Sequence, residues 1–355
     1  MTSETIGTWV RSVPLPDEEA AQAARARQQT LTKPPGSLGE LEAISVRLAG
    51  IQARAIPEIT GKAVLVMAGD HGVVSEGVSA YPQDVTAQMV LNFLQGGAAI
   101  NVLARAVGAR VAVVDMGVAV EIPQSDGLVR VHIADGTANM ARGPAMTPEQ
   151  AVRAVEAGGR VALDLIESGV DLLACGDMGI GNTTASAAII AAMTGQPPED
   201  VVGPGTGISD GALRHKVAVV AQALERNEPD PGDALDVLAK VGGLEIAGLA
   251  GAMLAAAGRR CAVIVDGLIS SAGALVACGL QPRVREFLFA GHLSVEPGHR
   301  AALAALGLEP LLDLQLRLGE GTGAVLAMPL IEAAARVLAE MATFESAGVA
   351  GRVGE

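Results

Sequence analysis

One carboxylate residue, Glu320, lies between glycines, which leave the backbone around it without side chains. It lies between Gly319 and Gly321 in the stretch RLGEGTGAV (317–325), with apolar residues close on either side. Glycines remove side-chain bulk, so a ligand could lie against the backbone within reach of this carboxylate. Apolar surroundings would raise the pKa of the carboxyl group and make it a better proton acceptor near neutral pH. The alternative is a solvated turn residue that precedes a helix capped by Thr322.

Two glycine-rich stretches, CGDMGIGNTTAS (175–186) and VVGPGTGIS (201–209), each lead into a predicted helix. Glycines and hydroxyls at a helix N-terminus are typical of an anion site, because free amides and the helix dipole both face the ligand. The lysine of a P-loop is missing, but two such loops with the isolated Lys216 favour a phosphate pocket. Its predicted contacts are Gly181, Asn182, Thr183, Gly205, Thr206, Gly207 and Lys216.

A third stretch, GDHGVVSEGVSAYPQDVTAQMV (69–90), makes a long connection after a predicted strand. Asp70 and His71 could act as an acid, a base or a ligand. The alternative is an ordinary turn before a helix that Asp84 and Thr86 begin. A connection of this length between buried elements is usually functional, which favours the first interpretation.

A fourth stretch, AGHLSVEPGHR (290–300), places His292, Glu296 and His299 at a spacing that a metal site could use. Pro297 and Gly298 interrupt any helix that would align these ligands, and no Cys or Asp cluster completes a coordination shell. We therefore favour hydrogen-bonded structural histidines and expect no metal.

The composition of the 355 residues excludes several classes of function. A net charge of −14 argues against nucleic acid and against anionic membranes, and aromatic residues, at 2%, are too few to stack bases. Three cysteines without a C-x-x-C pair indicate a reducing compartment. We find no signal peptide and no run of 18 uncharged apolar residues, so we expect a cytoplasmic protein.

The elements that position these stretches follow from the hydrophobic pattern. Nearly continuous apolar runs, typical of strands covered on both faces, alternate with helical patterns. The runs are 62–68, 110–116, 170–176, 261–267 and 285–291, and the helical patterns include 85–107, 148–168, 208–226 and 243–258. This alternation predicts an α/β fold with a doubly wound, mostly parallel sheet, in which ligands bind beyond the carboxyl ends of the strands.

The two ends of the chain show helical patterns without strands. Residues 17–54 read as two helical pieces separated by TKPPGS, and residues 323–347 as one long helix. We expect residues 1–55 and 320–355 together to form a small helical domain, beside an α/β substrate-binding domain over 56–319.

Taken together, the motifs resemble those of one family. The stretches TKPPGSLGELE (32–42), GDHGVVSEGVSAYPQDVTAQMV, GDMGIGNTTAS, GPGTGIS, GHLSVEPGH and LGEGTGA occur in the family's order from residue 32 to residue 324. The chain is thus similar, over nearly its whole length, to the nicotinate-nucleotide–dimethylbenzimidazole phosphoribosyltransferases, which make the lower-ligand nucleotide of cobalamin.

The resemblance implies a reaction and an assembly. Phosphoribose would move from nicotinate mononucleotide to dimethylbenzimidazole, giving α-ribazole 5′-phosphate and nicotinate, with no metal or other cofactor. Members of the family combine a doubly wound domain with a small helical domain built from both termini, and they form homodimers.

The resemblance also implies roles for residues. Glu320 would be the general base, because the attacking benzimidazole carries a proton that becomes acidic as the glycosidic bond forms. Gly176, Asp177, Gly179 and Gly319 would join the predicted phosphate contacts in binding the nucleotide, although members often carry Glu where this chain has Asp177. The base would lie against Ser79, Tyr81, Gln88 and Met89.

Other functions remain open from the sequence. Another metal-independent phosphoribosyl or nucleoside transferase, acting on a different nitrogen base, would share the loops and the acid. A non-catalytic nucleotide sensor would keep the loops but would not need a buried carboxylate. A metal-dependent hydrolase would require the 292–299 cluster and would lose activity on chelation.

Overall fold

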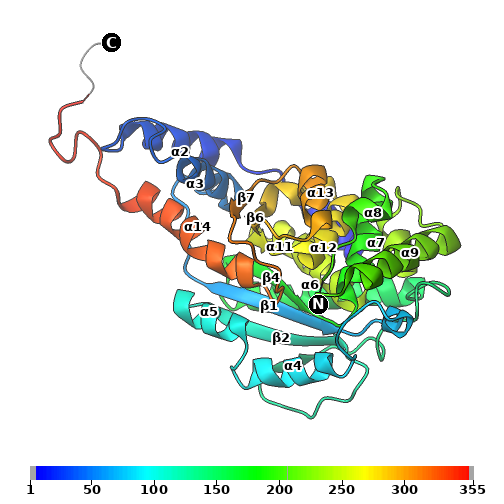
Figure 1. Cartoon of the computed structure of the whole chain (residues 1–355). Helices are drawn as coiled ribbons and strands as arrows, with labels where there is room; N and C mark the ends of the chain where they lie inside the picture. The colour runs from blue at the N-terminus through cyan, green and yellow to red at the C-terminus, as the bar shows by residue number, and fades with distance from the viewer. Residues whose placement is uncertain (1–4, 206, 352–355) are drawn as a thin grey trace.

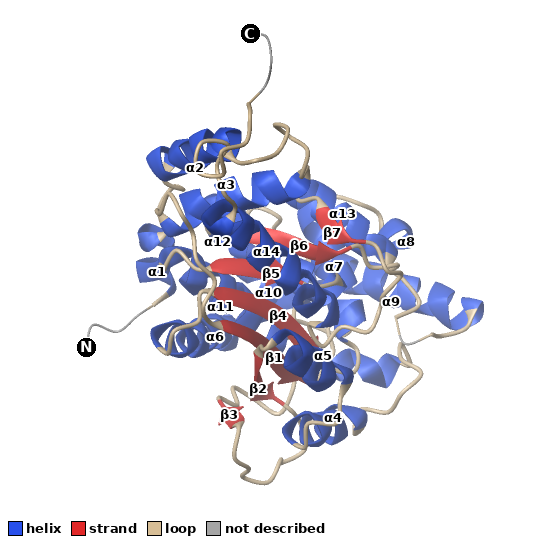
Figure 2. Ribbon diagram, turned by 90° about the vertical axis from the view of Figure 1, so that its left-hand side faces the viewer, coloured by secondary structure: helices blue, strands red, loops and turns tan. Residues whose placement is uncertain are grey.

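The computed structural model describes residues 5–205 and 207–351 and contains one seven-stranded sheet. All pairs of neighbouring strands are parallel, and the strand order is β3-β2-β1-β4-β5-β6-β7 (Figure 2). The strands are β1 (Lys62–Gly69), β2 (Arg110–Gly117), β3 (Leu128–Arg130), β4 (Leu172–Met178), β5 (Ala262–Val265), β6 (Leu288–His292) and β7 (Pro310–Leu312). The order runs outward in opposite directions from β1 and β4, which confirms the predicted doubly wound sheet. Ligands bind at such a reversal.

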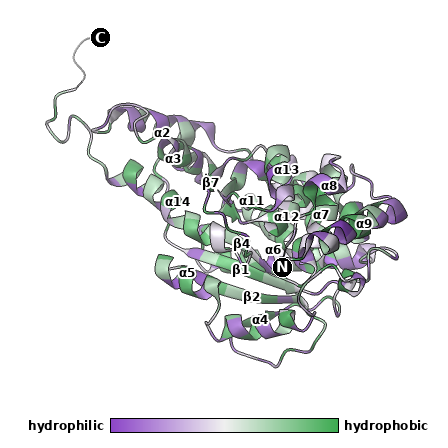
Figure 3. Ribbon diagram, viewed as in Figure 1, coloured by the Kyte–Doolittle hydropathy of each residue, from purple (hydrophilic) through white to green (hydrophobic). Residues whose placement is uncertain are grey.

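Burial on both faces explains why the strands read as apolar runs. In β1 every residue from Ala63 to Gly69 is buried, and helices cover both sides of the sheet. In Figure 3 hydrophobic residues fill β1 and β2, and hydrophilic residues gather on the outlying helices α2 and α9. The short edge strands β3 and β7 were not predicted, because three residues that are only partly buried make no apolar run.

Helices connect most of the strands, and the predicted helices are largely confirmed. Those with predicted counterparts are α2 (Glu18–Thr30), α3 (Glu40–Gln52), α6 (Pro148–Glu167), α7 (Asn182–Thr194), α9 (Asp210–Asn227), α11 (Leu244–Gly258) and α14 (Thr322–Glu340). Two helices, α4 (Val85–Leu94) and α5 (Ala99–Val107), share one predicted helix. The remaining ones are α1 (Ile6–Ser12), α8 (Pro198–Val201), α10 (Ala234–Val241), α12 (Leu268–Leu280) and α13 (Pro297–Leu306).

Three of the predicted elements were wrong in extent. The helix expected over 323–347 ends at Glu340. The single helix expected over 85–107 is two helices, because the chain turns at Gly96, whose φ is +76°, and at Gly97. The strand expected over 285–291 begins only at Leu288, because Pro282–Phe287 forms the 3-10 helix η2. By length and composition alone, Val85–Val107 and α14 could each cross a membrane. The first is broken at these glycines, and α14 packs on β4, β5 and β6 as a core helix does.

The ends of the chain pack together, as the sequence suggested. Helices α2 and α3 lie beside the C-terminal part of α14 (Figure 1). Arg27 Nε and Nη2 donate to the carbonyls of Leu338 and Ala339, at 2.5 and 2.9 Å. Helix α1 packs elsewhere, on α6 and α11, where the ring of Trp9 covers Gly159. The division into two domains at residues 55 and 320 stays a prediction.

Candidate active site

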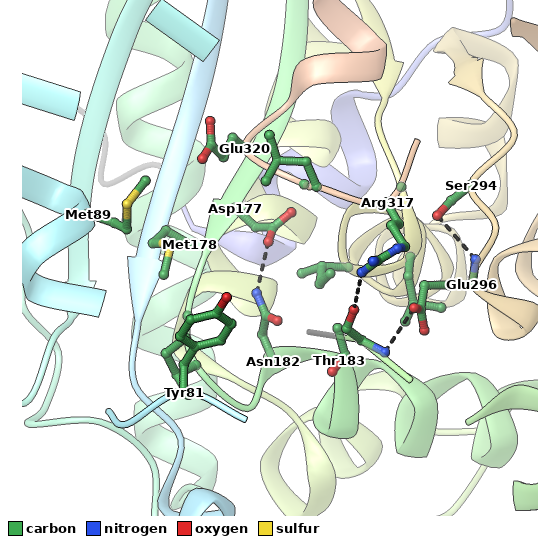
Figure 4. Close-up of a pocket in the computed structure, with 18 of the residues that line it drawn as sticks. Tyr81, Met89, Asp177, Met178, Asn182, Thr183, Ser294, Glu296, Arg317 and Glu320 are labelled. Atoms are coloured by element: carbon green, nitrogen blue, oxygen red, sulfur yellow. Dashed lines mark hydrogen bonds between the residues drawn. The ribbon is translucent and has the colours of Figure 1, made fainter. Parts of the chain in front are cut away.

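A cavity of about 510 Å³ opens beyond the carboxyl ends of β4, β5 and β6, next to the reversal of strand order. Its walls come from the segments that follow these strands, from the turn before α14, and from α4 with the loop before it. Its two ends differ chemically (Figure 4). Tyr81, Met89 and Met178 line one end with Glu320, whereas Thr183, Arg317 and Glu296 line the other.

Glu320 is buried in the cavity wall, with 5% of its surface exposed, which excludes a solvated turn residue. Gly319, Glu320 and Gly321 have φ angles of +81°, +62° and +89°, so three consecutive residues are left-handed. This backbone turns the Glu320 side chain toward α5, where its Oε2 accepts a hydrogen bond from the amide of Ile100 at 3.1 Å. Burial raises the pKa of Glu320, and the amide only partly opposes that shift.

Thr322 does not cap α14 in the way that the alternative interpretation supposed. The N-cap residue is Gly321, which has no side chain, and Thr322 Oγ1 donates back to the carbonyl of Gly319 at 2.9 Å. Gly176 in β4 leaves room for this turn, since a Cβ there would lie 2.3 Å from the Glu320 carbonyl oxygen. Gly176, which was predicted to bind the nucleotide, therefore packs against the turn and does not line the cavity.

Asp177 lies near the end of β4 and lines the middle of the cavity. Its Oδ2 accepts a hydrogen bond from Asn182 Nδ2 at 2.8 Å, whereas its buried Oδ1 has no hydrogen-bond partner. Burial raises the pKa of Asp177 well above its ordinary value, and the nearby charges of Asp266, Glu245 and Glu320 raise it further. The open Oδ1 is therefore free to bond a ligand hydroxyl.

The predicted phosphate loops do come together, but Lys216 lies behind them. Its side chain is 1% exposed and does not line the cavity, and its Nζ donates to Thr183 Oγ1 at 2.8 Å and to the Gly203 carbonyl at 3.0 Å. Burial lowers the pKa of Lys216 to about 8, against the opposing charge of Glu296. Lys216 therefore does not reach the cavity in this structure. Its charge would act through Thr183.

The other predicted nucleotide contacts divide into two groups. Gly179, Asn182, Thr183, Gly205 and Gly319 line the cavity with Asp177. Gly181 and Gly207 do not line it, and Thr206 lies outside the described residues. Gly181 is the left-handed N-cap of α7, with a φ of +94°, and so shapes the loop from which Asn182 and Thr183 project.

Sequence reasoning missed Arg317 at the phosphate end and considered Glu296 only as a metal ligand. Arg317 lines the cavity and donates from Nη1 to the Gly205 carbonyl at 3.0 Å, and Glu296 Oε1 accepts from the Gly205 amide at 2.9 Å. Glu296 is 4% exposed, its Oε2 has no hydrogen-bond partner, and burial raises its pKa. The signal for Arg317 was its place as the one basic residue in RLGEGTGAV.

Two of the four predicted base contacts reach the cavity. Tyr81, at the rim, and Met89 line it, together with Val85 one turn earlier on α4. Gln88 does not, because neighbouring residues of a helix point about 100° apart, and its side chain is exposed to solvent. The Ser79 hydroxyl is also outside the lining and accepts a hydrogen bond from the Tyr81 amide at 3.1 Å.

The two histidine rings of the fourth motif lie side by side, with centroids 5.8 Å apart, and each has its own polar neighbour. His299 Nδ1 accepts from the Ser294 amide at 2.9 Å, and His292 Nδ1 lies 3.6 Å from Asp266 Oδ1. Burial lowers the pKa of His292 to about 4 and that of His299 to about 3, so both are neutral. Among the described residues, no three His, Cys, Asp or Glu side chains converge as metal ligands would.

Asp70 and His71 lie under the cavity floor and outside its lining. His71 Nε2 and Glu245 Oε1 are 2.6 Å apart, and both side chains are almost fully buried. Asp70 Oδ2 accepts from the Ala119 amide at 2.9 Å.

Thr86, fully buried on α4, supports the cavity floor. Its Oγ1 accepts from the Ile180 amide at 3.1 Å, which fixes the loop after β4 against α4. Thr86 is therefore a tertiary contact more than a helix start.

Comparison with known proteins gives one consistent answer. A phosphoribosyltransferase family model matches residues 13–349. A nicotinate-nucleotide–dimethylbenzimidazole phosphoribosyltransferase of Roseiflexus sp. is 59% identical over 353 residues, which is 99% of each chain. The enzyme of that name from Geobacter sulfurreducens is 58% identical over 94% of this chain and 95% of its own. A crystal structure of the one from Thermus thermophilus superposes with a TM-score of 0.90 at 55% identity, over 95% of this chain and 100% of that one.

The variant Thr86→Val tests the layer under the cavity. Valine keeps the shape of threonine but leaves the buried Ile180 amide without its acceptor. We expect the free energy of unfolding to fall by about 1–3 kcal/mol, measured by denaturant unfolding. The control is Thr184→Val, because Thr184 is also fully buried but its hydroxyl has no hydrogen-bond partner. Equal losses in the two variants would contradict the role given to Thr86.

Proposed function

The chain belongs to the nicotinate-nucleotide–dimethylbenzimidazole phosphoribosyltransferase family, and from that premise we propose how its cavity transfers phosphoribose from nicotinate mononucleotide to dimethylbenzimidazole. One observation carries the proposal. A single cavity places a buried carboxylate beside apolar side chains at one end, and glycine loops with Thr183 and Arg317 at the other. A flat apolar base with a proton to lose suits the first end, and a phosphate suits the second.

The phosphate of the nucleotide lies at the end formed by Asn182, Thr183 and Arg317. Arg317 uses Nη1 for the Gly205 carbonyl, and its other N–H groups are donors suited to phosphate oxygens. Lys216 donates to Thr183 Oγ1, so the Thr183 hydroxyl proton is available to the phosphate. The ribose lies between the two ends, where Asp177 Oδ1 meets one of its hydroxyls.

The base lies against Tyr81, Val85, Met89 and Met178, close to Glu320. One nitrogen of dimethylbenzimidazole attacks C1′ of the ribose while the bond from C1′ to nicotinate breaks, and nicotinate leaves with the electron pair of that bond. The proton on the second benzimidazole nitrogen passes to Glu320, which must lie within about 2.6–3.2 Å of it. Attack from the face opposite nicotinate converts a β-nucleotide into an α-riboside.

Charge supports this order of events. Nicotinate mononucleotide carries a positive pyridinium ring, and positive charge grows at C1′ as the bond to that ring breaks. Glu320 faces this region and is negatively charged when ionised, and burial raises the pKa values of Glu320 and Asp177, which makes both carboxylates better proton acceptors. The same cavity therefore favours the cationic transition state and accepts the proton that is released.

We propose further that the chain is a cytoplasmic homodimer that binds no nucleic acid. The net charge of −14 supports the last point, since it would repel a phosphate backbone. Exposed apolar side chains, such as Val102 on α5 at 52% and Val120 after β2 at 49%, would be covered by association with a second copy. Light scattering at the mass of two chains would agree with this assembly, and the mass of one chain would contradict it.

The variant Glu320→Gln tests the general base. Glutamine keeps an oxygen for the Ile100 amide but cannot accept the proton of the base, so we expect kcat to fall by about 10²–10⁴-fold. Because the pKa of Glu320 is raised, the parent enzyme should lose activity as pH falls through that value, and the variant should lack this limb of its profile. The control is Glu309→Gln, an exposed carboxylate just before β7, at the amino ends of the strands and outside the cavity lining. Turnover within a few-fold of the parent would rule out Glu320 as the base.

The variant Lys216→Met tests the phosphate end. It removes the charge behind Thr183 while keeping an unbranched side chain, so we expect nucleotide affinity to weaken about tenfold or more by calorimetry. In the parent, affinity should decline as pH rises through about 8, because the ammonium then loses its proton while the phosphate stays dianionic. The variant should show no such decline. Lys240→Met, which removes a surface ion pair with Asp236, is the control, and an unchanged affinity in Lys216→Met would contradict the assignment.

A further inference from the structure

Helix α14 begins without a cap from its own segment of chain. Its N-cap residue is Gly321, so no local side chain accepts the first amides of the helix. Asp266, which directly follows β5, supplies both acceptors from 55 residues away. Its Oδ2 accepts from the Gly321 amide at 3.2 Å, and its Oδ1 accepts from the Ala324 amide at 2.8 Å.

These two hydrogen bonds fix the position of the peptide group that follows Glu320. The Gly321 amide belongs to the peptide bond that follows Glu320, and Glu320 is the one residue with a side chain in a run of three left-handed residues. Such a conformation costs about 1–3 kcal/mol in a residue other than glycine and persists only where the surroundings over-determine it. Asp266 holds the turn from the helix side, and β4 supports it from below through Gly176.

The surroundings of Asp266 explain why its charge matters. The side chain is 0% exposed, and burial raises its pKa to about 7, although the α14 amides lower it. The ionisable groups that face it are His292 from β6, Asp177 and Cys175 from β4, and Glu320 from the turn. His292 is neutral near pH 7, so the α14 amides are the counterpart of the Asp266 charge.

We infer that Asp266 is a positioning residue for phosphoribosyl transfer, because its carboxylate anchors the turn that aims Glu320 into the cavity. The inference rests on the proposed function of Glu320 as the base. Asp266 itself does not line the cavity and would touch neither substrate. A displacement of about 1 Å in a catalytic group can cost about 10²-fold in rate, so a loosened turn should be visible in kcat.

The first test is Asp266→Asn in the full chain. Asparagine keeps the shape, but its NH2 group cannot accept an amide proton, so one of the two bonds to α14 is lost. We expect kcat for transfer from nicotinate mononucleotide to dimethylbenzimidazole to fall about tenfold or more, with the Kd of the nucleotide unchanged within about twofold. An unchanged kcat in a folded variant would overturn the inference.

A matched control separates positioning from helix capping. Asp233 caps α10 with the same two-amide pattern, accepting from Leu235 N at 3.0 Å and from Asp236 N at 3.2 Å. Neither Asp233 nor α10 lines the cavity. Asp233→Asn should therefore lower the thermal midpoint and leave kcat unchanged. A loss of kcat as large as that of Asp266→Asn would reduce Asp266 to an ordinary cap and overturn the inference.

A double-mutant cycle with Glu320→Gln tests whether Asp266 acts through Glu320. If it does, Asp266→Asn should slow the parent but have little further effect in the Glu320→Gln background. An equal effect in both backgrounds would overturn the positioning role while leaving the base assignment intact. A Glu320→Gln enzyme that is as fast as the parent would instead overturn the proposed base, so the two failures are distinct.

Two readouts add information that a merely structural role would not give. Repulsion between the Asp266 and Glu320 carboxylates is mutual, so removing the Asp266 charge should move the acid limb of the rate profile to lower pH.

If Asp266→Asn does not fold, the unmodified protein still allows a test of the hydrogen bonds from Asp266 to α14. Its Gly321 and Ala324 amide resonances should titrate together near pH 7, and amides that do not respond to pH would overturn the inference.

Discussion

The site depends on burying several carboxylates whose partners are mainly backbone amides. Glu320 accepts from Ile100, Glu296 from Gly205, and Asp266 from Gly321 and Ala324. An amide fixes the position of a carboxylate without neutralising its charge, so burial still raises the pKa of all three. A side-chain cation in the same place would lower those pKa values and leave weaker proton acceptors.

Close approach of backbones makes this arrangement possible. The turn of residues 319–321 lies on β4 only because Gly176 has no Cβ, and Gly323 accommodates the His292 ring in the same way, with a hypothetical Cβ 1.8 Å from Nδ1. Two segments distant in sequence thus meet without a side chain between them. The glycines serve the site by removing bulk, and the lining atoms come from their neighbours.

The positions of the charged side chains along the cavity link the fold to the proposed reaction. The end of β4 and the loop after it supply Asp177 at the middle of the cavity and Thr183 at the end with Arg317, so in the proposed mechanism this strand end would face both the ribose and the phosphate. Arg317 and Glu320 stand three residues apart but serve opposite ends, because the left-handed turn between them reverses the chain. In the proposed mechanism one short segment of chain would therefore contact both the donor and the acceptor of phosphoribose.

The sequence alone determined the parallel doubly wound sheet, most helices and the residues Glu320, Asp177, Asn182 and Thr183, because burial periodicity and glycine-rich strand ends are local signals. Tertiary structure decided which side chains reach the cavity. Lys216 turned out to lie behind Thr183, and Gln88 to point away on α4, since a residue's direction depends on how its helix docks. Arg317 and Asp266 carried no local signal strong enough to single them out. Their partners, Gly205 and the start of α14, are 112 and at least 55 residues away, and only the folded sheet brings them together.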